Sequence, residues 1–382
     1  MDIRWLILAA LAVAIAQAFL FRRYGLRHLT YQRYFNEQAV YCNEQIELIE
    51  RIENAKWLAL PWVTVESMFP TGLHFGPMTE TAVLSGEAFQ YHHSLFTLSA
   101  FTRVTRRHRI TCIARGVYGM QDATLTCGDL LGGKPHFIQI HAQSKLIVYP
   151  AIVPLQEIPL PTHSWQGPIA VRRFVLPDPF TIAGTRDYQQ GDPLNQIHWS
   201  ATARSGRLQV HKRDFTADYQ LMILLNFEVS EEMWEIVTDP ALIERGLSFA
   251  ATLVQEATSL GVEVGFACNG TLPEESSSYA LARSANNTGS DRDRENRSYP
   301  HFYPRAGLPH LHTVLTAMAE VTMRCAGSFH SLVTREQEDT YRPLDYLIIT
   351  AHQSARLKDS VDALETVGHT VTIVPLDKPP TA

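Results

Sequence analysis

The amino-acid sequence predicts a multidomain protein with an N-terminal transmembrane helix, an immunoglobulin-like β-sandwich and a C-terminal α/β domain built on a parallel sheet. Three observations predict this order. An apolar run lies close to the N-terminus. Short segments of alternating polarity with glycine turns follow it to about residue 153, a pattern typical of antiparallel sandwiches. From residue 219 onward, apolar strands alternate with helical periods, as in proteins with a parallel sheet.

The composition limits the class of protein. The chain has 382 residues, of which 45% are hydrophobic, and at roughly 150 residues per domain this length predicts two to three domains. Lys and Arg total 33 against 39 Asp and Glu, a net charge of -6. A nucleic-acid-binding protein would show a basic excess, so we expect no nucleic-acid partner. The mean hydropathy of -0.10 excludes a polytopic membrane protein but leaves room for one span.

The first element is the apolar stretch of residues 3–21. At 1.5 Å per residue it is about 28 Å long, close to the hydrocarbon thickness of a bilayer. A cleaved signal peptide is the alternative, because residues 16–18 read Ala-Gln-Ala, like a cleavage site. However, Arg4 is offset by Asp2, and the apolar run continues past that motif. We therefore assign residues 1–28 to a transmembrane anchor with its basic flank.

The charges beside this span predict its orientation. Only Arg4 and the amino terminus precede it, whereas four arginines follow it: Arg22, Arg23, Arg27 and Arg33. Because the more positive side stays in the cytoplasm, we expect a single-pass cell-membrane protein with cytoplasmic soluble domains. The five cysteines are scattered without a CxxC motif, which fits reduced, buried thiols.

The second element is a β-sandwich domain over residues 30–155. Its clearest strand candidates are residues 44–52, 62–66, 109–113 and 123–127, which alternate in polarity. The histidines at 92 and 93 and the basic run at 106–109 are interpreted as a polar loop and a solvated strand edge.

A junction over residues 156–215 carries a dense set of distinctive residues. These are Arg186, Tyr188, Gly191, Asp192, Ile197, Trp199 and Arg204. Asp192 and Pro193 suit a helix start, and Gly206 suits a helix end. Arginine–carboxylate pairs and aromatic anchors favour a buried clasp between domains. The alternative is an acid–base or metal site of Asp192, His198 and His211, but their spacing matches no ligand motif.

The third element is the α/β domain of residues 216–382. Apolar runs predict strands, and helical periods predict the segments between them. The strands are 220–227, 262–268, 344–350 and 369–374, and the helices are 241–260, 308–325 and 355–367. A polar Ser-, Asn- and Arg-rich stretch predicts a disordered insertion at 271–305.

Several of these motifs resemble the bacterial "domain of unknown function 58" family. The similarity is carried by residues 186–204 together with residues 54–73, 115–119, 128–132 and 148–150, although Leu131 replaces the usual aromatic residue. The resemblance implies a membrane-anchored protein with a C-terminal von Willebrand factor A-like region. It also implies partners: a MoxR-type AAA+ ATPase and a transglutaminase-like membrane protein.

The resemblance also indicates where a metal motif would lie, at the end of the first α/β strand. The expected pattern is D-x-S-x-S, but this chain has Asn226, Glu228 and Ser230. Hard cations need several well-placed oxygens, so this degenerate set predicts no bound metal. No glycine-rich phosphate loop follows the strand, which argues against nucleotide binding, and we expect no cofactor.

The function that these observations favour is a membrane-anchored, non-enzymatic scaffold or adaptor that binds proteins. One alternative is an extracytoplasmic, metal-dependent ligand-binding or adhesion module. The other is a hydrolase that uses Asp192 and His198.

Overall fold

The computed structural model describes fourteen stretches of the chain and divides it into two compact units, Met1–Ala151 and Ile152–Ala382. The described residues are 3–76, 81–85, 89–120, 122–128, 135–141, 144–160, 182–188, 197–213, 220–229, 236–273, 276, 278, 299–339 and 344–377. We call the two parts unit 1 and unit 2 and describe each by itself.

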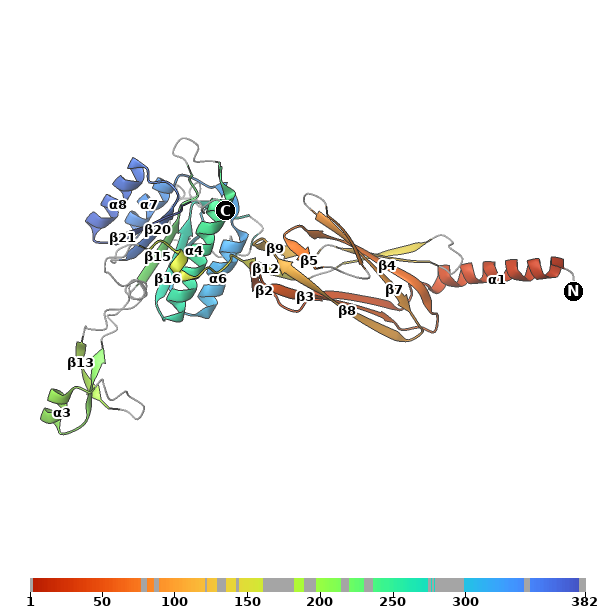
Figure 1. The fold of residues 1–382 in the computed structure, drawn as a ribbon, viewed down its shortest axis with the longest axis horizontal. Helices are drawn as coiled ribbons and strands as arrows, with labels where there is room; N and C mark the ends of the chain where they lie inside the picture. The colour runs from red at the N-terminus through yellow and green to blue at the C-terminus, as the bar shows by residue number, and fades with distance from the viewer. Residues whose placement is uncertain are drawn as a thin grey trace. The chain divides into compact units, whose positions relative to one another are not determined.

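Unit 1 begins with helix α1, Ile3–Tyr24 (Figure 1). It is the one helix among the described residues that is long and apolar enough to cross a membrane, with a mean hydropathy of 2.1 over its most apolar window. Phe21 in its last turn is buried against the core that follows. Just beyond it, the ammonium group of Lys56 donates hydrogen bonds to the carbonyls of Gly25 and Arg27, both at 2.8 Å. The predicted helix is therefore present, and its orientation stays a prediction.

Substituting Leu11 and Val13 together by arginine is expected to release the protein from membranes. Each arginine at the centre of a span costs about 2.5–3.5 kcal/mol on insertion scales, and both residues are exposed on α1. The measurement is the share of the protein that stays in the membrane fraction after an alkaline wash. The matched control is Leu11→Ile with Val13→Leu, which keeps the span apolar. A double-arginine variant that still sediments with the membranes would contradict the anchor assignment.

The rest of unit 1 is β-rich, as predicted. One antiparallel sheet has the order β1-β3-β8-β5, and a second has the order β11-β10-β4-β7-β6. The first sheet comprises β1 (Leu29–Phe35), β3 (Gln45–Asn54), β8 (Thr102–Cys112) and β5 (Leu73–Phe75). The second comprises β11 (His136–Ile140), β10 (Ala123–Cys127), β4 (Leu60–Pro70), β7 (Phe89–Leu98) and β6 (Thr81–Ser85).

The two sheets share a core, so unit 1 is a sandwich. The rings of Phe69 on β4 and Phe75 on β5 meet edge to face, with 4.9 Å between centroids. Alternation along β3 buries every second side chain from Ile46 to Asn54, as a strand with one face on a core requires. A small third sheet has β12 (Lys145–Tyr149) between β2 (Ala39–Tyr41) and β9 (Gly116–Gly119).

One interpretation of the sequence of unit 1 is wrong. His92 lies on a buried, inward-facing position of β7 and not in a polar loop. Of the described strands, β5 pairs with residues 110–112 of β8 and leaves residues 106–108 paired with β3 alone, so most of the basic run does lie on a strand edge. His108 within that run nevertheless faces the core. A histidine reads as polar in sequence, but its position in the strand alternation decides whether it is buried.

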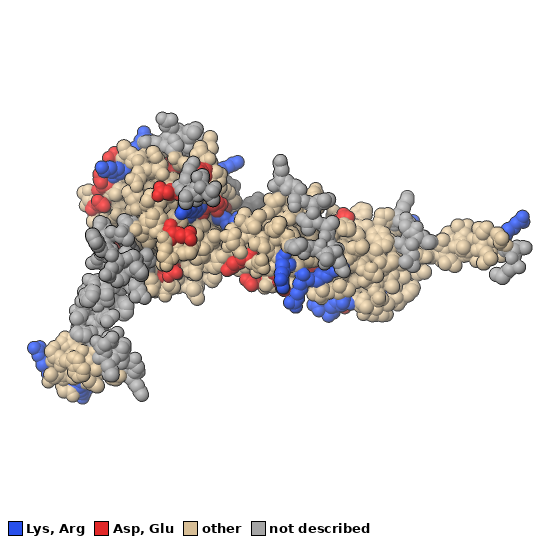
Figure 2. Space-filling model, viewed as in Figure 1, with Lys and Arg blue, Asp and Glu red and all other residues tan. Residues whose placement is uncertain are grey.

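The outer face of β8 does carry the expected charges. Figure 2 shows Lys and Arg side chains gathered over β3 and β8. Arg103 pairs with Glu53 at 2.7 Å, and Arg107 pairs with Glu47 at 3.3 Å, across neighbouring strands. Such exposed pairs contribute little to stability, typically under about 1 kcal/mol.

Unit 2 contains a sheet of five strands in the order β18-β16-β15-β20-β21. Four of them pair in parallel: β15 (Gln220–Leu225), β16 (Glu263–Cys268), β20 (Asp345–Thr350) and β21 (Thr370–Pro375). Helices α7 (Phe329–Asp339) and α8 (Ala355–Val367) pack with β15 and β20 into one hydrophobic core. Helices α4 (Pro240–Ser259) and α6 (Leu308–Glu320) pack against each other, and α4 also packs against strands β15 and β16.

Two predictions for unit 2 need correction, and one helix was missed. The predicted helix at 308–325 ends at Glu320, and Thr322–Cys325 form strand β19, which pairs with β17 (Gly270–Thr271). Within the predicted insertion at 271–305, His301–Arg305 form β18, an antiparallel edge strand on β16. Residues 279–298 lie outside the described residues. Helix α7 was not predicted, because its sequence is polar apart from a narrow apolar stripe.

Unit 2 also holds a hairpin formed by the distinctive junction residues. Strand β13 (Ile182–Asp187) pairs antiparallel with β14 (Gln209–Arg213), and the short helix α3 (Trp199–Ser205) precedes β14. A 3-10 turn, Leu155–Glu157, lies near the start of the unit.

Candidate functional site

The strand order of unit 2 marks one place on the sheet for a binding site. From β15 the chain crosses to β16 on one side, and it later returns to β20 on the other side. Open α/β sheets bind their ligands outside the carboxyl ends of strands at such a switch point. A cavity of about 70 Å³ lies there. We call it the carboxyl-end cleft, and its lining residues are Asn226, Glu228, Ser328, Phe329, His330, Ser354, Arg356 and Leu357.

Asn226 fastens the two strand ends on which the cleft is built. Its backbone N–H donates to the carbonyl of Ile349 at 2.9 Å, and its side-chain Nδ2 donates to Oγ1 of Thr350 at 3.1 Å. Its Oδ1 accepts the backbone N–H of Glu228 at 2.9 Å. The side chain is buried, at 3% exposure, so its amide groups serve the fold.

Two helices begin at the cleft. Oε1 of Glu228 accepts the backbone N–H of Phe329, the first residue of α7, at 2.5 Å. Oγ of Ser354 caps α8 by accepting the N–H of Leu357 at 3.1 Å. A carboxylate at a helix N-terminus is stabilised by the helix dipole, so Glu228 is held by the start of α7.

The cleft is polar and small. Arg356 lies exposed in the first turn of α8, and Nδ1 of His330 lies 2.6 Å from Oγ of Ser360. Pockets for small-molecule ligands usually enclose about 300–1,000 Å³, well above the volume of this one. The cleft has room for a single side chain of a partner rather than for a metabolite.

The degenerate metal motif falls on this cleft. Asn226 and Glu228 both line it, while Ser230 lies outside the described residues. Oδ1 of Asn226 and Oε1 of Glu228 each already accept a backbone hydrogen bond. Both side chains therefore also hold the strand end and the start of α7.

The structure brings part of the predicted signature together in the hairpin. Arg186 lies on β13 opposite Val210, and the N–H of Tyr188 donates to the carbonyl of Leu208 at 2.9 Å. Ile197 is buried and forms a bridge to Val210. Gly191 and Asp192 lie outside the described residues.

Two other signature residues are exposed within this hairpin. Trp199 is 68% exposed at the start of α3, and Arg204 is exposed in its last turn. Ile197 takes the buried position, and α3 buries none of its residues. The clasp between domains stays a prediction. Gly206 ends α3 in a left-handed conformation, as predicted.

His198 has a structural role in the same hairpin. It is the N-cap of α3, and its Nδ1 accepts the N–H of Ala201 at 3.1 Å and lies 2.9 Å from Oγ of Ser200. The side chain of His211 lies outside the described residues, as does Asp192. The acid–base site of these three residues therefore stays a prediction.

The sequence did not point to most of the cleft. Ser328, His330, Ser354 and Arg356 come from two helix starts that lie about 100 residues or more beyond Asn226 in the chain. The serine before a predicted helix, Ser354, was the available signal, because serine is a favoured N-cap.

Comparisons with known proteins support part of the resemblance. A family model described as "Protein of unknown function DUF58" matches residues 184–326, which include the hairpin and the strands β15 and β16. No curated protein matches the chain.

Matches among solved structures are distant. A non-cellulosomal cohesin from Archaeoglobus fulgidus is 8% identical, covers 31% of this chain and 91% of its own, and has a TM-score of 0.23. The seventh ScaB type I cohesin from Pseudobacteroides cellulosolvens is 13% identical, covers 33% and 95%, and has a TM-score of 0.21. The full-length major pilin SpaD from Corynebacterium diphtheriae is 8% identical, covers 29% and 33%, and has a TM-score of 0.23. Scores this low say nothing about what this chain binds.

Proposed function

We propose that this chain is a membrane-anchored, non-enzymatic scaffold or adaptor that binds a partner protein at the carboxyl-end cleft. The proposed partners are a MoxR-type AAA+ ATPase and a transglutaminase-like membrane protein. The observation that carries the proposal is the cleft itself: it sits at the switch point of the sheet, and its volume is about 70 Å³. That volume suits one inserted side chain of another protein.

The order of the parallel strands supports the proposed von Willebrand factor A-like nature of unit 2. The first strand, β15, lies in the interior of the sheet between β16 and β20, and helices pack on the sheet. This arrangement puts the residues after β15 at the binding edge. A degenerate metal motif at that edge is compatible with a protein-binding face that works without an ion.

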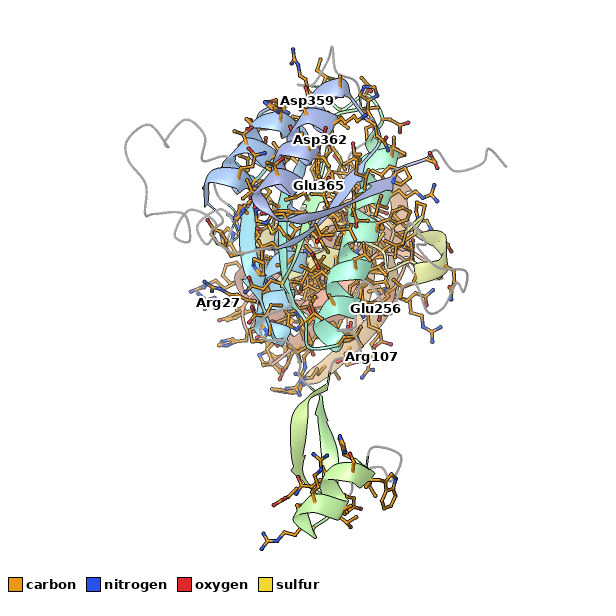
Figure 3. The ribbon with its side chains drawn as sticks, turned by 90° about the vertical axis from the view of Figure 1, so that its left-hand side faces the viewer. Arg27, Arg107, Glu256, Asp359, Asp362 and Glu365 are labelled. Atoms are coloured by element: carbon orange, nitrogen blue, oxygen red, sulfur yellow. The ribbon has the colours of Figure 1, made fainter. Side chains whose placement is uncertain are left out.

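The charges around the cleft indicate what kind of partner surface fits. Glu228 and Arg356, of opposite sign, both line it. Along α8, Asp359, Asp362 and Glu365 lie on the exposed side of the helix (Figure 3). A partner that offers an acidic side chain to Arg356 and basic side chains to α8 would be complementary to this surface.

Reversing one charge at the cleft is expected to weaken partner binding. In the Arg356→Glu variant, a like charge faces the partner group that Arg356 recognises, and such a juxtaposition costs several kcal/mol. Each 1.4 kcal/mol is tenfold in affinity, so we expect at least about a tenfold lower recovery of the AAA+ ATPase. The measurement is a quantitative pull-down of the full-length protein from native membranes.

The matched control is Lys358→Glu. Lys358 lies on the same helix and is exposed, but it does not line the cleft. The same charge change there is expected to leave recovery close to that of the unmodified protein. The proposal is wrong if the unmodified protein recovers no AAA+ ATPase, or if the two variants lower its recovery equally. Exposure of unit 2 to protease on intact cells would also rule out a cytoplasmic partner.

A further inference from the structure

A cluster of polar side chains lies inside the core of unit 1, where a sandwich normally packs apolar residues. Glu50 on β3, His92 on β7 and His108 on β8 are 0%, 1% and 8% exposed. All three occupy inward-facing positions of their strands, and the strands belong to both sheets. We call these three residues the core cluster. The proposed function makes no use of it.

The three side chains bring their polar atoms together. Nε2 of His108 lies 2.9 Å from Oε2 of Glu50, and Nδ1 of His92 lies 4.0 Å from Oε1 of Glu50. The two imidazole rings are 5.1 Å apart between centroids. One atom from each residue can be chosen so that all three lie within 4.8 Å of one another. The cluster therefore converges on a space the size of one ion.

Hydrogen bonding within the protein does not account for His92. Among the residues that the structure describes, neither of its ring nitrogens has a hydrogen-bond partner, although the residue is 1% exposed. Its ring stacks on Phe75 at 5.1 Å and meets Phe69 edge to face at 5.7 Å. An unpaired buried polar group costs free energy, and phenylalanine would avoid this cost in the same aromatic setting. A ligand bound by Nδ1 would supply the missing partner.

We propose that the core cluster binds one divalent transition-metal ion, and that zinc is the ion its ligands suit best. Two imidazoles and a carboxylate are an established zinc donor set. With Zn–N and Zn–O bonds of about 2.0–2.2 Å, neighbouring ligand atoms of a tetrahedral site lie about 3.4 Å apart. The imidazole–carboxylate distances, 2.9 Å from His108 to Oε2 and 4.0 Å from His92 to Oε1 of Glu50, fall on either side of this value. Small side-chain shifts would therefore bring the three ligands to the spacing of a zinc site.

The carboxylate of the cluster is already oriented by two hydroxyl groups. Tyr31 donates from its hydroxyl to Oε1 of Glu50 at 2.7 Å, and Oγ of Ser94 donates to Oε2 at 3.1 Å. Partners of this kind hold a ligating side chain in one orientation and tune its affinity for metal. The second layer of a metal site is thus present around Glu50.

A buried cation beside the core cluster is expected to weaken zinc binding. Arg33 on β1 is buried, and its guanidinium lies 4.8 Å from the ring centroid of Phe69, the same ring that His92 meets. Arg33 lies directly across from Glu50 in the pairing of β1 with β3, and its charge opposes a second cation by Coulomb repulsion. Arg33→Met is therefore expected to tighten zinc binding about tenfold.

The test uses the full-length protein purified in detergent with an affinity tag that contains no histidine. After treatment with a chelator, the protein is titrated with Zn²⁺, and bound metal is counted by mass spectrometry. Co²⁺ is added in parallel, because a tetrahedral site gives cobalt an intense visible absorption. We expect about one tight zinc per chain and a higher unfolding temperature with zinc than without.

Two aromatic variants on one strand separate the core cluster from other histidines. His92→Phe fills the same core space without a ligand, and it should lower zinc occupancy by tenfold or more and abolish the zinc-dependent rise in unfolding temperature. His93→Phe changes the neighbouring residue, whose side chain is 44% exposed, and should bind zinc like the unmodified protein.

Folding of His92→Phe is checked by the hydrogen-exchange protection of β3, β7 and β8. If a folded His92→Phe binds zinc as well as the unmodified protein does, the metal is held elsewhere and the proposal is wrong. It is equally wrong if the unmodified, folded protein takes up no zinc and gains no thermal stability from it.

Discussion

Glu50→Ala is expected to be among the most destabilising single substitutions in unit 1, with a loss of about 3–5 kcal/mol in the free energy of unfolding. The Glu50 carboxylate is fully buried and accepts hydrogen bonds from Tyr31 and Ser94, and it pairs with His108 at 2.9 Å. Alanine removes the acceptor but leaves these groups in the core. Each unpaired group then keeps its desolvation cost.

The charge state of Glu50 strengthens this expectation. Burial by itself raises the pKa of the carboxyl, but the hydrogen bonds from His108 and Tyr31 and the charge of His92 outweigh it and hold the pKa at about 2. The group is therefore ionised at neutral pH, and it lies across from the buried Arg33 in the pairing of β1 with β3. Removing one member of a buried charge pair leaves the other uncompensated, which is the costly case.

The measurement is native-state hydrogen exchange of the full-length protein in the presence of a chelator, read at β3, β7 and β8. The chelator removes any contribution of a bound metal. Glu53→Ala is the matched control, because Glu53 lies on the same strand and pairs with Arg103 at the surface. It should cost less than about 1 kcal/mol. Equal effects of the two substitutions would show that the Glu50 cluster contributes no more than a surface pair.

Strand alternation could have revealed the core cluster, but the sequence alone could not assemble it. In β3 the inward positions Ile46, Leu48 and Ile52 are apolar, and Glu50 interrupts the series. That interruption indicates a buried charge that needs partners. The sequence could not identify these partners, because His92 and His108 come from strands that meet Glu50 only through strand pairing and sheet packing.

The same division between local and long-range information holds in unit 2. Strand β15 could be predicted because a strand buried on both faces is a continuous apolar run, and its burial pattern agrees. Asn226 and Glu228 could be placed because they follow that strand directly. Arg356 and His330 could not be assigned to the same cleft, since the parallel pairing of β15 with β20 brings their helices there.

Strand β18 escaped prediction because its signals point away from a strand. The segment His301–Arg305 contains a proline and follows a long polar stretch, and proline is confined to sheet edges and bulges. The structure places it at the edge, with a bulge opposite Val264 to Phe266. The residue that permits this close pairing is on the neighbouring strand: Gly265.

Gly265→Val is therefore expected to displace β18 and to destabilise unit 2 by about 3 kcal/mol, the upper end of the usual range for overpacking. A Cβ at this position would lie 2.7 Å from the carbonyl oxygen of Phe302 and 2.8 Å from the nitrogen of Pro304. Both are backbone atoms of β18, so relief requires moving the strand. Gly265→Ala should destabilise unit 2 less than Gly265→Val does.

Displacing β18 would also break a buried contact that holds the edge strand to the helical layer. Nε2 of His301 on β18 lies 2.6 Å from Oε1 of Glu336 on α7, and both side chains are buried. The measurement is denaturant unfolding of the full-length protein, followed by hydrogen exchange in β18 and α7. Gly119→Ala is the control, since a Cβ there meets nothing within 4 Å. If Gly265→Val unfolds at the same denaturant concentration as this control, β18 does not pack against β16 as tightly as its backbone contacts require.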